Sequence, residues 1–190
     1  MLLETISILD GTIQHLSHHQ ARLSASQRAL FTEYTPIDLE DAIRPTSASG
    51  QIKCRVRYAQ DLIDVTFEPY IPREIRRLKP IDSTIEYAYK YSDREAIEEL
   101  FSRRGEADDI LIVKNGLVTD TSAANIAFYD GSRWHTPKNP LLHGTTRERL
   151  LRSGFLTPRD IPIGQIDRFE AFALMNAMIG FLPIRNGIIA

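Results

Sequence analysis

Three groups of residues along the chain could act together on one small molecule. Lys90 carries an amine that can bind an aldehyde covalently as a Schiff base. Asp120 could keep the nitrogen of a pyridine ring protonated, so that the ring accepts electrons. Gly144-Thr145-Thr146-Arg147 has the residue types of a helix start, where unpaired backbone N–H groups receive anions such as phosphate. An amine, a carboxylate and an anion-binding turn in this order are what the chemistry of pyridoxal phosphate (PLP) requires.

Each of these groups has a simpler alternative. A surface lysine needs no partner, an aspartate before Thr-Ser is a common turn former, and the Gly-Thr-Thr-Arg turn can be a plain helix cap. Lys90 is preferred because it follows an aromatic-rich segment, where burial would favour the neutral amine. The other lysines fall in a strand pattern, a basic run, a hairpin turn and a proline-flanked loop: Lys53, Lys79, Lys114 and Lys138.

Longer stretches around these residues resemble a known family, the class IV aminotransferases or fold-type-IV PLP enzymes. The resemblance spans nearly the whole chain. It rests on Glu4-Thr5-Ile6, Asp10-Gly11, His19-Gln20-Ala21-Arg22-Leu23, Tyr89 to Arg94, Leu117 to Phe128 and Gly144 to Arg147. Two departures stand out. Asp120 replaces the glutamate usual in the family, and the chain opens almost directly at Leu3-Glu4-Thr5, without the family's preceding Gly-rich hairpin.

The resemblance implies an α+β fold like that of D-amino-acid aminotransferase, with two small domains and the cofactor site between them. We place these domains at residues 1–82 and 83–190, because Pro69, Pro72 and Pro80 punctuate the intervening stretch. The resemblance also implies a homodimer that binds PLP and no metal. Lys90 would be both the catalytic and a cofactor-binding residue. The other implied cofactor-binding residues are Arg22, Asp120, Asn125, Thr145, Thr146 and Asn176.

Two stretches look nearer to the 4-amino-4-deoxychorismate lyases of this family, Lys90 to Arg94 and Met175-Asn176-Ala177. The lyase reaction releases pyruvate and forms 4-aminobenzoate for folate synthesis. One alternative is a PLP-dependent aminotransferase acting on branched-chain or D-amino acids. Another is a non-catalytic relic of the fold that binds a phosphate ligand. Retention of Lys90 and a carboxylate argues against a relic, and the absence of a Lys-containing Gly-rich loop argues against nucleotides.

The composition is ordinary for a soluble globular protein, and the resemblance implies a small-molecule amino substrate. Of 190 residues, 43% are hydrophobic and 25% are charged, and a net charge of -2 gives no reason to expect nucleic acid. The single cysteine, Cys54, excludes an intrachain disulfide. No apolar run has membrane-spanning length and no signal-peptide pattern begins the chain, so we expect a cytoplasmic protein that binds no membrane.

Periodicity and turn residues predict the elements that position these groups. In the first domain we expect a strand over 2–9, helices from about 17 to 30 and from 38 to 43, a loop over 45–50, and paired strands over 51–58 and 62–70. Ser17 and Gln20 have the spacing of a capping box. In the second we expect a strand over 84–89 that delivers Lys90, a helix from about residue 93, short strands between 109 and 136, and helices over 146–152 and 168–178.

Overall fold

The computed structural model describes residues 1–44 and 49–190, which divide into two compact units. The first contains Met1–Ile71 and Tyr89–Asp93; the second contains Pro72–Ala88 and Arg94–Ala190. The division predicted from the prolines, between residues 82 and 83, thus differs from the one found. The reason is that strand β5 (Arg77–Asp82) pairs in parallel with β6 (Asp109–Lys114). Because of this pairing, the stretch from Pro72 to Asp82 belongs to the second unit. Most of the predicted 45–50 loop lies outside the described residues.

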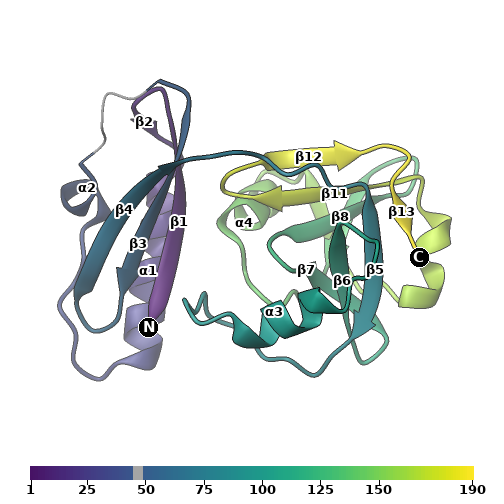
Figure 1. Ribbon diagram of the computed structural model, residues 1–190, viewed down its shortest axis with the longest axis horizontal. Helices are drawn as coiled ribbons and strands as arrows, with labels where there is room; N and C mark the ends of the chain where they lie inside the picture. Colours follow the sequence, from purple (N-terminus) through teal and green to yellow (C-terminus); the bar gives the residue numbers. More distant parts are fainter. Residues whose placement is uncertain (45–48) are drawn as a thin grey trace. The chain divides into compact units, whose positions relative to one another are not determined.

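The first unit is an antiparallel sheet with a helix along one face (Figure 1). Its strands are β1 (Leu2–Leu9), β2 (Thr12–Ile13), β3 (Gln51–Tyr58) and β4 (Leu62–Pro69), in the order β2-β1-β3-β4. The helices are α1 (Leu16–Leu30) and α2 (Leu39–Ala42). Alternate strand residues point to one face of a sheet, and here that face is apolar. Its buried members include Leu2, Ile6, Ile8, Cys54, Val56 and Tyr58.

The short segment Tyr89–Asp93 joins this unit by backbone contacts with the start of β1. Leu3 N donates to Lys90 O at 2.9 Å, and Ser92 N donates to Met1 O at 3.2 Å. The predicted strand over 84–89 is wrong, because the nearest strand, β5, ends at Asp82. Lys90 is therefore positioned by β1 and not by a strand that leads into it.

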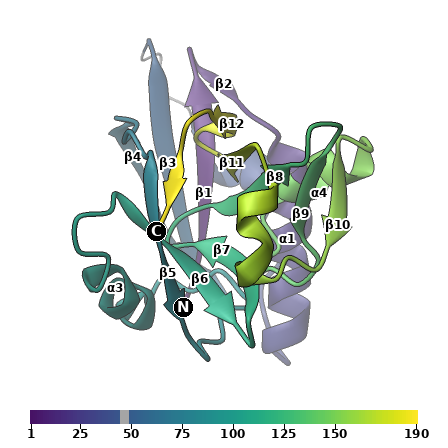
Figure 2. The ribbon, with the colours of Figure 1, turned by 90° about the vertical axis from the view of Figure 1, so that its right-hand side faces the viewer.

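The second unit is built on a mixed sheet (Figure 2). Its strand order is β10-β9-β8-β7-β6-β5-β13, and β11 pairs with both β8 and β12. The remaining strands are β7 (Leu117–Thr121), β8 (Asn125–Tyr129), β9 (Trp134–Pro137), β10 (Leu156–Arg159), β11 (Ala171–Asn176), β12 (Gly180–Ile184) and β13 (Ile188–Ile189). Helices α3 (Glu95–Ser102) and α4 (Thr145–Arg152) and the 3-10 helix η1 (Ile163–Arg168) complete it.

The predicted helix over 168–178 is wrong, because this stretch forms strand β11. The strand pairs with β8 and β12, and Phe172, Ala173, Leu174 and Met175 are all buried, because Phe172 and Leu174 pack in one apolar cluster and Met175 packs in another. A strand covered on both faces has a continuous apolar run, and such a run has no period that distinguishes it from a buried helix.

The other expected helices and strands are confirmed, with one difference at a helix start. Helix α1 begins at Leu16 after His15, which has a left-handed φ of 53° and makes no side-chain cap bond. The capping box predicted from Ser17 and Gln20 is therefore not formed. Gln20 instead donates to Ile37 O at 2.8 Å and accepts from Leu39 N at 2.8 Å, which ties α1 to α2.

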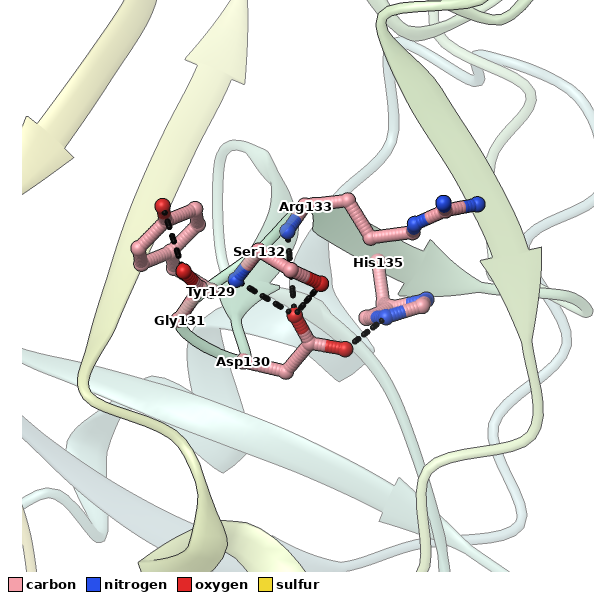
Figure 3. A network of polar contacts seen from close by, with 6 residues as sticks. All are labelled: Tyr129, Asp130, Gly131, Ser132, Arg133 and His135. Atoms are coloured by element: carbon pink, nitrogen blue, oxygen red, sulfur yellow. Dashed lines mark hydrogen bonds and ion pairs between the residues drawn. The ribbon is translucent and has the colours of Figure 1, made fainter.

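A compact network closes the turn between β8 and β9 (Figure 3). Asp130 Oδ1 accepts hydrogen bonds from Ser132 N, Ser132 Oγ and Arg133 N at 2.9, 2.8 and 3.0 Å. Its Oδ2 lies 2.6 Å from His135 Nε2. These donors, led by the Arg133 N–H, hold the pKa of Asp130 well below its usual range. The turn thereby fixes β8 against β9, and β8 begins at Asn125.

Candidate active site

The β7–β8 hairpin brings Asp120 and Asn125 opposite each other. They form the register pair of the two strands, and the intervening turn is closed by Thr121 N, which donates to Ala124 O at 2.9 Å. Ala124 N in turn donates to Thr121 Oγ1 at 3.1 Å. As a result, Asn125 Nδ2 donates to Asp120 Oδ1 at 2.7 Å.

The peptide of Leu142 completes a closed hydrogen-bonded ring with these two side chains, which we call the Asp120 ring. Leu142 N donates to Asp120 Oδ2 at 2.9 Å, and Asn125 Nδ2 donates to Leu142 O at 2.8 Å. Asp120 and Asn125 are 4% and 6% exposed, so water contributes little here. Burial raises the pKa of Asp120 to about 6, although the Asn125 amide, the Leu142 N–H and the charge of Arg147 oppose the rise.

Helix α4 begins three residues after Leu142, and its N-terminal end could bind an anion. Gly144 is its N-cap and makes no side-chain cap bond. The first helical hydrogen bond is donated by Glu148 N to Gly144 O at 2.9 Å, so the N–H groups of Thr145, Thr146 and Arg147 precede the helical ladder. All three of these residues are buried. The helix dipole adds partial positive charge at the same place.

Arg147 adds a buried full charge beside this helix start. Its Nη2 donates to Pro137 O at 2.7 Å and its Nε to Thr136 Oγ1 at 3.3 Å. Burial lowers the pKa of Arg147, and the charge of Asp120 opposes that effect. Among the described residues, neither Arg147 nor Asp120 takes part in an ion pair. In the sequence, Arg147 stands out only as part of the turn motif. Its burial beside a helix start is visible only in the fold.

The second unit therefore offers a buried carboxylate and a helix start that could bind an anion, connected through Asn125 and Leu142. An ionised carboxylate has about four lone-pair directions, and the Leu142 N–H and Asn125 amide use two of them, so Asp120 can still accept a proton-bearing ring nitrogen. The N–H groups of α4, with Arg147 nearby, match a phosphate. The donor set fits PLP, with its pyridinium nitrogen and its phosphate.

Asn176, another residue predicted to bind the cofactor, holds two turns together. Its Nδ2 donates to Ala123 O at 3.1 Å, in the turn between β7 and β8. Its Oδ1 accepts from Met178 N at 2.9 Å and Ile179 N at 3.0 Å, which closes the β11–β12 turn. These contacts place Asn176 beside the turn that carries Asp120 and Asn125.

Arg22 and Lys90, the other two predicted site residues, belong to the first unit. Lys90 is half-buried, and its backbone is held by Leu3 as described above. Arg22 donates from Nε to Glu4 Oε1 at 2.8 Å and from Nη2 to Glu4 Oε2 at 2.6 Å. His19 Nδ1 lies 2.7 Å from the same Oε2. His19 thus orients Arg22 only through Glu4, which sequence reasoning did not weigh as part of the site.

Glu4 is the feature that the sequence could have revealed. It stands between Leu2 and Ile6 on the inward face of β1, where an acidic residue is costly unless paired. Its side chain is fully buried, which by itself raises the carboxyl pKa. The charge of Arg22 and the hydrogen bonds from His19 and Arg22 outweigh burial and lower the pKa to about 2.

Two features are absent from the described residues, 1–44 and 49–190. No helix in this part of the chain is both long and apolar enough to span a membrane. Within the same residues, no group of three or more His, Cys, Asp or Glu side chains could hold a metal ion.

Comparison with known proteins identifies relatives over the whole chain. An uncharacterised protein of Haemophilus influenzae is 39% identical over 189 residues, which cover 94% of this chain and 98% of that protein. The crystal structure of a "putative 4-amino-4-deoxychorismate lyase" from Haemophilus somnus is 34% identical, covers 94% of this chain and 96% of that one, and has a TM-score of 0.88. A "putative aminodeoxychorismate lyase" of Schizosaccharomyces pombe is 26% identical and covers 99% of this chain and 89% of that protein.

The family model described as amino-transferase class IV matches residues 88–186, from just before Lys90 to the end of the β11–β12 hairpin. These findings confirm the predicted fold, that of the fold-type-IV enzymes. The chain belongs to the class IV aminotransferase family.

Proposed function

We propose that the protein is a PLP-dependent enzyme that acts as a 4-amino-4-deoxychorismate lyase, releasing pyruvate and forming 4-aminobenzoate. The observation that carries the cofactor assignment is the buried Asp120 ring next to the anion-binding start of α4. The lyase assignment is supported by two relatives whose names are those of such lyases, one of them 34% identical.

When bound, PLP withdraws electrons from the carbon that carries the substrate amine. In our proposal, Asp120 keeps the ring nitrogen protonated, and the N–H groups of Thr145 and Thr146 hold the phosphate with the help of Arg22. Lys90 binds the cofactor aldehyde until a substrate amine replaces it. The freed Lys90 amine then moves a proton at the substrate carbon next to the nitrogen.

An aminotransferase is the second candidate, and the family description itself favours it. The same residues would hold the cofactor, and Lys90 would return the proton to the cofactor side to release a keto acid. The two reactions therefore differ in their products, not in the residues proposed to hold the cofactor.

Cofactor binding can be tested apart from the reaction. Purified protein incubated with PLP should gain an absorption band in the near-ultraviolet to visible range. Borohydride reduction and peptide mapping should then find the pyridoxyl group on Lys90. Lys90→Ala should lose the label, whereas Lys114→Ala, which removes an ion pair with Glu86, should keep it. Labelling of another lysine would refute the assignment of Lys90.

The reaction is tested by the products. Unreduced enzyme loaded with PLP should convert 4-amino-4-deoxychorismate to equal amounts of pyruvate and 4-aminobenzoate. Formation of keto acids from branched-chain or D-amino acids with 2-oxoglutarate, without 4-aminobenzoate, would replace the lyase proposal by the aminotransferase. The proposal includes a cytoplasmic homodimer, which light scattering and cell fractionation can test.

A further inference from the structure

We propose that Asn125 is a positioning residue that fastens Asp120 to the start of α4, and that residue 144 is glycine because the Asn125 amide occupies the space of a side chain there. The inference deepens the proposed function and rests on it for the role of Asp120. It replaces the prediction that Asn125 contacts the cofactor itself.

The first support is that the Asn125 amide has no donor left for a ligand. A side-chain amide carries two hydrogens on its nitrogen. One is donated to Asp120 Oδ1 at 2.7 Å and the other to Leu142 O at 2.8 Å. Both bonds stay within the Asp120 ring, and Asn125 is 6% exposed. Asn125 therefore has no side-chain N–H group to donate to a phosphate and acts on a ligand through Asp120 and Leu142.

The second support is the contact between Asn125 and Gly144. A Cβ placed on Gly144 would lie 2.0 Å from Asn125 Oδ1 and 3.2 Å from Asn125 Cγ. The backbone of Gly144 gives no reason for glycine, because its φ of -70° and ψ of 142° are open to any residue. Glycine at this position therefore allows a close approach of the Asn125 amide to the backbone.

These contacts join the two ends of the proposed cofactor site. Asp120 is the partner of the ring nitrogen, and Gly144 is the N-cap of the helix that binds the phosphate. Asn125 contacts both, and Leu142 connects them along the chain. The ring-nitrogen contact and the phosphate contact are thereby held at a fixed separation, as pre-organised binding of one rigid molecule requires.

The packing half of the proposal is tested by a double-mutant cycle on the protein without cofactor. Gly144→Ala should lower the melting temperature, because the new methyl group meets the Asn125 amide. In an Asn125→Ala background the same change should have little effect, since the nearest atoms all belong to the Asn125 side chain. Asn125→Ser also removes those atoms and serves if the alanine variant does not fold. Gly164→Ala, with no atom within 4 Å of the added Cβ, is the control.

An additive cycle, with the same loss in both backgrounds, would overturn the packing half. The positioning half is tested by affinity for two ligands, PLP and an analogue that has a C–H group in place of the ring nitrogen. Asn125→Ala should weaken PLP binding by about tenfold, as for a lost hydrogen bond to a charged group, and leave the affinity for the analogue unchanged. Asp120→Asn should give the same pattern.

Equal weakening of both ligands in Asn125→Ala would show that Asn125 acts elsewhere than on the ring nitrogen and would refute the positioning role. Wild-type protein that binds neither ligand would refute the proposed function, and the positioning role with it. The double-mutant cycle would still decide why residue 144 is glycine, so the two failures are distinguishable.

Discussion

Replacing Glu4 by glutamine would remove the negative charge that Arg22 and His19 contact in the first unit. The change keeps the side-chain shape and leaves Arg22, whose side chain is 15% exposed, without its carboxylate partner. The pKa of Glu4 falls from an ordinary 4.5 to about 2. One pKa unit is equivalent to about 1.4 kcal/mol, so ionised Glu4 contributes about 3 kcal/mol to the free energy of unfolding. We expect Glu4→Gln to lose about that much at pH 7.

The pH dependence gives the prediction its sign. Because the pKa of Glu4 is depressed in the folded protein, its contribution is complete above about pH 4.5 and is lost as the pH falls toward 2. The difference between wild type and Glu4→Gln should be constant from pH 7 to pH 5 and then shrink by about 1.4 kcal/mol for each pH unit below 4.5. Urea unfolding followed by circular dichroism, without added PLP, measures this difference.

Glu68→Gln is the matched control within the same sheet. Glu68 pairs with Lys53 at 2.6 Å, but its side chain is 46% exposed, so solvent screens the pair and the loss should be much smaller. The reasoning fails if Glu4→Gln costs no more than this control at pH 7. It also fails if the difference between wild type and Glu4→Gln does not change between pH 5 and pH 3.

Three further changes in the second unit have defined outcomes. Gly187→Ala would place a Cβ 2.3 Å from a ring carbon of buried Phe172, so it should cost about 1–3 kcal/mol by urea unfolding while Gly164→Ala is neutral; equal stability of the two would contradict the packing. Thr136→Val removes the donor to a buried strand carbonyl at 2.8 Å and should cost about 1–3 kcal/mol, with retained stability as the opposing result. Without PLP, burial raises the pKa of Asp120 to about 6, so the folded protein binds a proton at Asp120 more tightly than the unfolded chain does. The resulting contribution to the free energy of unfolding is complete below about pH 4 and is lost as the pH rises through 6. Asp120→Asn should lack this part of the pH dependence, which amounts to about 3 kcal/mol. Free energies of unfolding that change in parallel with pH for wild type and Asp120→Asn would contradict this prediction.

Local signals in the sequence predicted much of the fold. Asn115-Gly116 has positive φ at both residues, as a tight hairpin turn between β6 and β7 requires. Asp38 caps α2 through its side chain, which accepts from Glu40 N at 2.8 Å. In both cases, neighbouring residues contain the whole cause of the structure.

Where the cause lies in distant residues, the sequence was insufficient. Strand β11 was predicted as a helix because only its partners, β8 and β12, determine that it is extended. The candidate site shows the same limit. The family pattern singled out Asp120 and Asn125, but the roles of Leu142 and Gly144 depend on contacts across 17 to 22 residues of chain.

The return of Tyr89–Asp93 to the first unit has a consequence for synthesis of the protein on the ribosome. Domains generally fold as they emerge, beginning from the N-terminus. Here Leu3 N and Met1 O find their backbone partners only at residues 90 and 92. A nascent chain that ends at Ile71 therefore has the whole sheet β2-β1-β3-β4, but the edge of β1 that faces away from β3 lacks these partners at its start. The first unit is completed when Asp93 has emerged, before β6, which begins at Asp109, has emerged. The residue proposed to carry the chemistry is thus also the one whose backbone closes the first unit, and its position is set before the second unit can fold.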